Sequence, residues 1–400
     1  MERGWLAGLV HFMVAGIGWL LILPCAFLIF LLYLPVVPNF RLYAHSLFPN
    51  YSPWPLLIAT AALLLALVAH RMNRTPGTVI LIFVATLTSV GAAIAFGQLL
   101  YVAQSNGASI RLLSTLEVRD FGADAAPDKS YAYAERDGQT LMLDYYRPKG
   151  PPPRGGWPVL VAIHGGGFVG GSRTIGAANM RWFADQGIAL VSVDYRLAGP
   201  GHPTWDIATG DVECALAWTA DHARALNIDI GRITLSGGSA GGNLAMNVGY
   251  AGKGRHTDPR CAARVPAIAL VVAKAPIIDL VKAWNFPGEL NGMNRSFLGR
   301  YIGGSPKDHP ARFASANPTR LVGKGAPPAL IMGGAADPLV PESGAVAFAA
   351  HAQAIGVSVR NIAFPHSGHD FNSNYGSVTN QAVRQIIVQF MDAHGQRKPR

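Results

Sequence analysis

The hydrophobic positions divide the chain into an apolar N-terminal part and a longer part with short apolar runs. Residues Trp5–Leu34 include no Asp, Glu, Lys or Arg, and the run Val10–Tyr33 is long enough to cross a bilayer. Two further apolar runs cover Trp54–Ala69 and Thr78–Val102. This pattern predicts an N-terminal bundle of about three transmembrane helices within residues 1–103.

A different pattern begins after this region. Residues 104–129 are mixed and polar without a strong period, which indicates a linker with one short helix over Ser109–Val118. From Ser130 onward, short apolar runs separated by turn residues return. We therefore expect an anchor region over 1–103, a linker over 104–129 and a globular domain over 130–400.

The globular part alternates strand-like and helical patterns. Two alternating segments flank the turn Asp137-Gly138, and the continuous apolar run Trp157–Ile163 is typical of a strand buried on both faces. Further strands are predicted at Gly187–Val193, Ile233–Leu235, Ala267–Val272, Ala329–Met332 and Val357–Ile362, and helices at Asp206–Leu226 and Val378–Ala393. This order predicts an α/β fold with a mostly parallel sheet flanked by helices and an antiparallel hairpin at its start.

Composition supports a membrane protein and argues against a nucleic-acid-binding protein. Half of the residues are hydrophobic and only 14% are charged, which is too apolar for an ordinary soluble protein. The net charge of +10 comes from scattered residues, with no Lys/Arg-rich block before the last few positions. We expect the lipid bilayer as a partner, and no nucleic acid.

The arginines near the apolar runs predict an orientation. The short loop after the second run contains Arg71 and Arg74, whereas the longer first loop contains Arg41 alone. By the positive-inside rule this places the short loop and the N-terminus in the cytoplasm. Three spans then put the globular domain on the extracytoplasmic side, although Arg111 and Arg119 oppose this orientation.

The three cysteines are too few and too widely spaced to form a disulfide framework. Cys25 lies in the first apolar run, and Cys214 and Cys261 lack the spacing of a zinc site. A Cys214–Cys261 disulfide requires an oxidising compartment, and we expect two buried free thiols instead.

Candidate chemistry centres on the pattern Gly237-x-Ser239-x-Gly241, which follows a predicted strand and precedes a helical run. This is the pattern of a nucleophile elbow, a sharp turn that exposes a serine hydroxyl. The pattern alone is weak, because flexible turns use the same residues. Asp337 and His369 also follow predicted strands, in the chain order Ser, Asp, His that this arrangement requires.

These residues suit acyl transfer. Ser239 is the expected nucleophile, His369 its base and Asp337 the acid that orients the imidazole. Asp279 competes with Asp337 for the role of acid, and His366 competes with His369 for the role of base.

An oxyanion hole is expected from backbone N–H groups. The glycines at 166 and 167, in a His-Gly-Gly-Gly run after the strand at 157–163, let the backbone approach a developing anion. Ala240, at the start of the helix after the elbow, supplies the third N–H group. The remaining histidines form no zinc-binding pair and the glycines form no P-loop or dinucleotide fingerprint, so we expect no metal and no cofactor.

Five short motifs occur together between Ser130 and the C-terminus: His164-Gly165-Gly166-Gly167, Asp194-Tyr195-Arg196-Leu197, Gly237-Gly238-Ser239-Ala240-Gly241-Gly242, Asp337-Pro338-Leu339 and His369-Asp370-Phe371. Their combination resembles the hormone-sensitive-lipase-like esterases and related carboxylesterases of the α/β-hydrolase superfamily. The resemblance implies the same triad and oxyanion hole. The sequence departs from the family pattern at Gly238, where one branch has aspartate, and at Asp370, where glycine is frequent. The resemblance also implies that the segment Asp279–Pro318 covers the site.

The expected function is therefore a membrane-anchored serine carboxylic-ester hydrolase, esterase-like or lipase-like, that forms an acyl-enzyme from a small-molecule or lipid-like ester. Two alternatives stay open: an amide-cleaving serine hydrolase (a formamidase or peptidase), and a non-catalytic ligand-binding module on the same fold.

Overall fold

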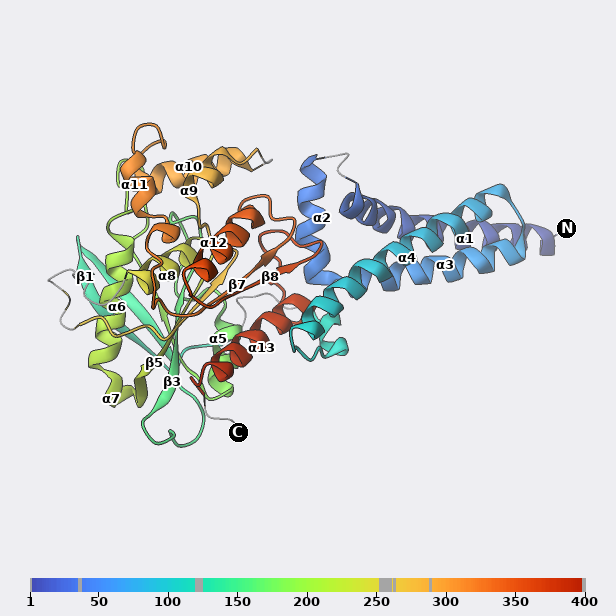
Figure 1. Ribbon diagram of the computed structural model, residues 1–400. Helices are drawn as coiled ribbons and strands as arrows, with labels where there is room; N and C mark the ends of the chain where they lie inside the picture. Colours follow the sequence, from blue (N-terminus) through green and yellow to red (C-terminus); the bar gives the residue numbers. More distant parts are fainter. Residues whose placement is uncertain are drawn as a thin grey trace. The chain divides into compact units, whose positions relative to one another are not determined.

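The computed structural model describes residues 2–34, 38–118, 125–251, 261, 264–287 and 290–397. Part of the expected linker, residues 119–124, therefore lies outside the described residues, as does Arg119. The chain forms two compact units, and Figure 1 labels most of their helices and several of their strands. The first unit contains residues 1–119 and 364–382, and the second contains residues 120–363 and 383–400. The expected domain boundaries stay a prediction; the compact units differ from them by grouping residues 364–382 with the N-terminal helices.

The first unit contains three helices that are long and apolar enough to cross a membrane: α1 (Glu2–Tyr33), α3 (Pro53–Met72) and α4 (Pro76–Ser105). They coincide with the three predicted spans. The buried faces of α3 and α4 carry small residues every three or four positions, namely Ala59, Ala62, Ala66 and Ala69 in α3 and Ala85, Thr88, Ala92 and Ala95 in α4. Small side chains let helix backbones approach closely, which is how helices associate in lipid.

The connection between α1 and α3 is a helix rather than the loop that the sequence suggested. Helix α2 (Pro38–Tyr51) buries Phe48 and His45, whereas Phe40 and Tyr43 are exposed. The predicted helix at Ser109–Val118 is only a short 3-10 helix, η1 (Leu112–Leu116).

The second unit is built on an eight-stranded sheet with the order β1-β2-β4-β3-β5-β6-β7-β8. The strands are β1 (Lys129–Arg136), β2 (Gln139–Tyr146), β3 (Trp157–Ile163), β4 (Ala189–Val193), β5 (Ile228–Gly238), β6 (Leu270–Lys274), β7 (Ala329–Gly334) and β8 (Val359–Phe364). The pairs β1–β2 and β2–β4 are antiparallel, and the pairs from β4 through β3, β5 and β6 to β7 are parallel. The predicted α/β class and the starting hairpin are confirmed.

Helices lie between these strands and after the last one. They are α5 (Ala177–Asp185), α6 (Ala208–Asp221), α7 (Ala223–Leu226), α8 (Ala240–Tyr250), α9 (Leu280–Asn285), α10 (Asn291–Ile302), α11 (Pro310–Ser315), η2 (Pro318–Arg320), α12 (Glu342–Ala354) and α13 (Val378–Ala393). β3 and β5 lie at the centre of the sheet, where their apolar side chains are buried among those of α6 and α8. Because β3, β5 and β7 are parallel, their carboxyl ends lie at one edge of the sheet. The motifs that directly follow these three strands lie at this edge: the glycine run, the serine turn and Asp337.

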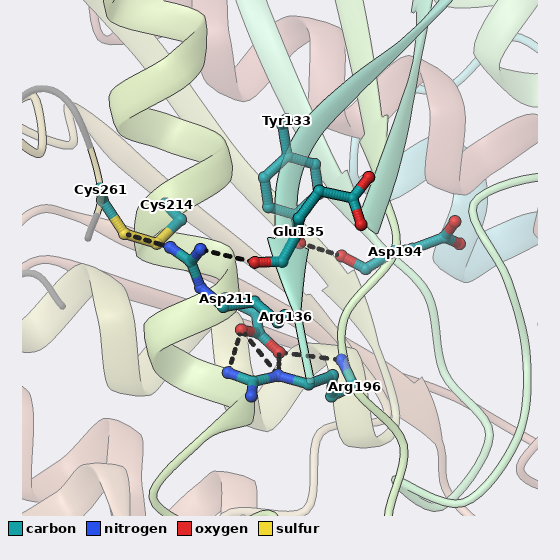
Figure 2. Close-up of a disulfide and its surroundings, with 8 residues drawn as sticks. All are labelled: Tyr133, Glu135, Arg136, Asp194, Arg196, Asp211, Cys214 and Cys261. Atoms are coloured by element: carbon teal, nitrogen blue, oxygen red, sulfur yellow. Dashed lines mark hydrogen bonds and ion pairs between the residues drawn. A yellow bond between two sulfur atoms is a disulfide. The ribbon is translucent and has the colours of Figure 1, made fainter. Parts of the chain in front are cut away.

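Cys214 in α6 forms a disulfide with Cys261 (Figure 2), so the expectation of two free thiols is wrong. Their Cα atoms are 5.2 Å apart, which is within the range for a disulfide. Arg136 at the end of β1 lies beside both sulfur atoms, with Nη2 3.6 Å from Sγ of Cys214 and 3.7 Å from Sγ of Cys261. The two cysteines are 47 positions apart in sequence, and the packing of α6 brings them together.

We predict that replacing both cysteines, Cys214→Ala with Cys261→Ala, lowers the free energy of unfolding by about 2–4 kcal/mol, because the cross-link restricts the unfolded chain. Maleimide labelling of denatured protein gives a direct check. One of the three cysteines, Cys25, should react before reduction, and all three after it. Three labels without reduction would contradict the pairing.

Candidate active site

Ser239 occupies a strained turn between β5 and α8. Its backbone has φ 52° and ψ −119°, a conformation that a residue with a side chain rarely adopts. The Ser239 N–H donates to the carbonyl oxygen of Lys274 at 2.8 Å, which ties the turn to β6. A Cβ atom added at Gly237 would collide with the backbone of Gly241, and one at Gly241 with the carbonyl oxygen of Ile163. Both positions therefore have room only for glycine, which is typical of a nucleophile elbow.

Ala240 begins α8 and is completely buried. The N–H groups of the first helical turn have no partner within the helix, and the helix dipole is positive at this end. The predicted oxyanion donor at Ala240 therefore lies where an anion is favoured.

The glycine loop after β3 lies against the elbow. A Cβ atom built on Gly165 would be 2.9 Å from the carbonyl oxygen of Gly238 and 3.4 Å from the Cβ of Ser239. Gly166 and Gly167 follow with φ 119° and 60°, which favour glycine. The structure therefore brings the predicted glycine donors and Ser239 into one neighbourhood.

Aromatic rings hold the glycine loop in place. The His164 ring stacks on Tyr195 with 4.3 Å between centroids, and its Nδ1 lies 2.7 Å from the carbonyl oxygen of Gly165. Burial lowers the pKa of His164, so the ring is neutral at neutral pH and Nδ1 donates to this carbonyl. The next aromatic residue, Phe168, stacks on Tyr301 of α10 at 3.7 Å.

Helix α10 also approaches the glycine loop at Phe297. A Cβ atom on Gly167 would lie 2.5 Å from the Phe297 ring, so a side chain at position 167 would displace it. Phe297 and Tyr301 belong to the segment Asp279–Pro318, which the resemblance implied as the cover of the site.

The Asp-Tyr-Arg motif after β4 braces the same edge of the sheet (Figure 2). Arg196 is buried and forms an ion pair with Asp211 of α6, with Nη2 2.7 Å from Oδ1. The Tyr133 hydroxyl donates to the carbonyl oxygen of Asp194 at 2.7 Å. These contacts fix the loop that presents Tyr195 to His164, so the motif supports the glycine loop.

Asp337 follows β7 and is only 8% exposed. Its Oδ1 accepts hydrogen bonds from the N–H groups of Leu339 at 2.8 Å and Val340 at 2.9 Å, which fix the carboxylate. The rival acid Asp279 is the N-cap of α9, where Oδ1 accepts from the N–H of Lys282 at 3.0 Å. Asp279 thus caps a helix, and Asp337 stays the predicted acid.

The two candidate histidines lie in the first unit, within residues 364–382. The His366 ring packs edge-on against Tyr33 and Phe48, with 5.2 and 6.2 Å between centroids, and Nε2 lies 2.5 Å from Oε1 of Gln98. These contacts give His366 a packing role within the first unit, and His369 stays the predicted base. Because Ser239 and Asp337 belong to the second unit, an assembled triad stays a prediction.

Lys274 is a neighbour of the elbow that the sequence did not reveal. Its Cε lies 3.9 Å from a Cβ atom built on Gly238, which β5 pairs with Lys274. Burial lowers the pKa of Lys274 to about 8. A lysine at the end of an apolar strand carries no sequence signal for this contact. Among the described residues, no group of three or more His, Cys, Asp or Glu is arranged to hold a metal ion.

The parallel sheet, the strained serine after β5 and the glycine loop after β3 define an α/β-hydrolase. Residues 143–351, more than half of the chain, match the BD-FAE family model. The chain therefore belongs to the BD-FAE family, and the resemblance to α/β-hydrolase esterases seen in the sequence is confirmed.

Individual relatives agree with this assignment. Esterase LipC of Mycobacterium tuberculosis is 30% identical over 65% of this chain and 64% of its own length. Ethyl acetate hydrolase of Pseudomonas putida is 28% identical over 63% of this chain and 78% of its own. The chain spans 64% of LipC and 63% of esterase LipQ from M. tuberculosis, so less than two thirds of each. The apo form of Thermogutta terrifontis esterase 2 superposes with a TM-score of 0.57 at 23% identity, over 70% of this chain and all of that one, which shows a shared fold.

We predict that Gly237→Ala and Gly238→Ala behave differently although they are neighbours. A methyl group at 237 meets backbone atoms, so this variant loses several kcal/mol of stability or does not fold, in line with overpacking against rigid atoms. A methyl group at 238 makes only ordinary contact with Lys274, so this variant changes stability by less than about 1 kcal/mol. Thermal melting of the two variants side by side checks this, and equal melting temperatures would refute the proposed crowding.

Proposed function

We propose that this protein is a serine carboxylic-ester hydrolase that works through an acyl-enzyme. The observation that carries the proposal is Ser239, held in a strained elbow against the glycine loop at the carboxyl edge of a parallel sheet. The names of relatives such as LipC and ethyl acetate hydrolase support ester bonds as the target.

In the proposed mechanism, Ser239 Oγ attacks the ester carbonyl carbon while His369 accepts the hydroxyl proton. Asp337 holds the second ring nitrogen and stabilises the imidazolium. The carbonyl oxygen becomes an anion that accepts hydrogen bonds from the N–H groups of Gly166, Gly167 and Ala240. Each of these hydrogen bonds lowers the free-energy barrier of the reaction by about 3–4 kcal/mol.

The intermediate then collapses. The C–O bond to the alcohol breaks, and His369 returns its proton to the leaving alkoxide. A water molecule then attacks the carbonyl carbon of the acyl-Ser239 ester while His369 accepts a proton from the water. The bond from this carbon to Ser239 Oγ breaks, and His369 returns the proton to Oγ. This step releases the carboxylic acid and restores the serine. The reaction needs no cofactor.

Short acyl chains are the proposed substrates. Phe297 and Tyr301 crowd the glycine loop, which limits space beside the acyl carbon. T. terrifontis esterase 2, which has the same fold, has structures with propionate and with butyrate bound. Three helices apolar enough to cross a membrane support attachment to a bilayer, so an amphiphilic ester also fits the proposal.

We predict that Ser239→Ala reduces hydrolysis of p-nitrophenyl butyrate by about 10⁴-fold or more and abolishes labelling by a fluorophosphonate probe, because the nucleophile is gone. His369→Gln and Asp337→Asn should reduce turnover by about 10³-fold or more. Steady-state rates at equal amounts of folded protein give the measurement, with matched amides run beside the esters.

The rival residues supply the controls for this experiment. Asp279→Asn and His366→Gln remove the same chemical groups outside the proposed triad and should keep turnover within about tenfold of the wild type. Retained activity in Ser239→Ala would refute the proposed function, and a dead Asp279→Asn variant would move the acid to that position.

We further propose that the three apolar helices span a membrane and that the second unit faces an oxidising, extracytoplasmic compartment. The Cys214–Cys261 disulfide supports this side, because disulfides persist in oxidising compartments. Arg71 in the last turn of α3 and Arg74 in the loop before α4 are both exposed, which agrees with a cytoplasmic location of this loop.

We predict that Lys149→Cys, whose parent side chain is 82% exposed in the second unit, reacts with a membrane-impermeant maleimide in intact cells. Arg74→Cys, in the exposed loop between α3 and α4, should react only after lysis. The reversed labelling pattern would place the second unit in the cytoplasm.

A further inference from the structure

The loop that carries His369 belongs to the first unit, with the N-terminal helices. Gly368 directly before His369 donates its N–H to the carbonyl oxygen of His45 in α2, at 2.8 Å. Directly after His369, Asp370 accepts a hydrogen bond at Oδ2 from the hydroxyl of Ser46, at 2.5 Å. Both sequence neighbours of the candidate base are therefore hydrogen-bonded to the same helix, α2.

Asn50, one turn further along α2, extends this contact. Its Nδ2 donates to the carbonyl oxygen of Asp370 at 2.9 Å and to that of Ser46 at 2.8 Å. Its Oδ1 accepts the N–H of Asn374 at 2.8 Å, and the Asn374 Nδ2 donates in turn to the carbonyl oxygens of Asn50 and Glu117 at 2.8 and 3.0 Å. Asn50 thus joins α2 to the loop at two positions, Asp370 and Asn374.

Burial makes this network rigid. Asn50 is 4% exposed and Asn374 is 2% exposed, so any hydrogen bond lost between them leaves a polar group without water. A Cβ atom on Gly368 would lie only 3.3 Å from the carbonyl oxygen of His45, so the absence of a side chain lets the loop approach α2 closely. The backbone on either side of His369 is therefore held by α2.

We propose that α2 positions the catalytic base, with Ser46 and Asn50 as positioning residues that fix the His369 loop from both sides. The N-terminal region then has a role in catalysis beyond attachment to the bilayer. The proposal rests on the proposed function, in which His369 is the base. It differs from a purely structural role because a displacement of about 1 Å at the base costs about 100-fold in rate without affecting substrate binding.

Asn50→Asp tests the proposal in the full-length protein in detergent or liposomes. Aspartate has the same shape as asparagine and keeps the oxygen that accepts the Asn374 N–H. It replaces the Nδ2 donor with a second carboxylate oxygen, which then faces the carbonyl oxygen of Asp370 without a hydrogen bond. We predict that kcat for p-nitrophenyl butyrate falls about 10- to 100-fold while KM stays within about twofold.

Ser46 provides a rescue pair on the same helix. Ser46→Ala removes the hydroxyl that donates to Asp370 and should lower kcat several-fold, whereas Ser46→Thr keeps a hydroxyl and should restore it. Leu47→Ala is the matched control, because Leu47 is adjacent and 47% exposed, and should leave kcat unchanged.

Active-site titration with a fluorophosphonate counts the competent molecules, so kcat per active site separates positioning from folding. If Asn50→Asp matches Leu47→Ala in kcat per active site, the proposal is overturned. A loss of active sites with an unchanged kcat per site overturns it too, because the role is then structural. Failure of the proposed function is distinguishable, since it appears as an active Ser239→Ala variant.

Discussion

The whole candidate site depends on one close approach of the backbone to itself at the start of α8. Gly237 and Gly241 touch across the elbow, and Gly241 also meets the carbonyl oxygen of Ile163 at the end of β3. Side chains at these positions would separate β5, α8 and the loop after β3. Because the sheet order puts β3 beside β5, the same contact that strains Ser239 also brings the glycine loop to it. The strained turn at Ser239 and the position of the glycine loop, for which we propose the roles of nucleophile and anion-binding backbone, thus arise from a single packing constraint.

The sequence predicted the parts of the fold whose pattern is local. The strand at Trp157–Ile163 and the helix at Val378–Ala393 have the predicted bounds, because an uninterrupted apolar run and a 3.6-residue period each identify their element. The sequence placed β5 too short, at Ile233–Leu235, because its polar start and glycine-rich end lack a hydrophobic pattern. Parallel pairing with β3 and β6 extends it to Ile228–Gly238. The motif residues could be found because each follows such a strand.

The parts that the sequence missed depend on contacts between distant residues. No local sequence pattern pairs Cys214 with Cys261, and the expectation that both are buried free thiols was wrong. Likewise, the sequence analysis treats Pro38–Tyr51 as part of the loop between the first two apolar runs, because Asn50 and His45 have no reason to be buried within their own segment. Their partners lie 324 and 323 positions later in the chain, at Asn374 and Gly368. Only the tertiary structure explains why a polar helix follows the first long apolar helix.

Polar residues at such a junction also have an energetic logic. A buried amide costs several kcal/mol unless it is satisfied, so an apolar contact between α2 and the loop would be the simpler way to join them. Hydrogen bonds differ from apolar packing because they fix orientation as well as distance. Asn50 satisfies its donors and acceptor at Ser46, Asp370 and Asn374 together, so a shifted loop would break several bonds at once. That all-or-none character fits our proposal that the loop holds the His369 imidazole in one direction, and under this proposal it accounts for an asparagine in α2 where leucine would pack.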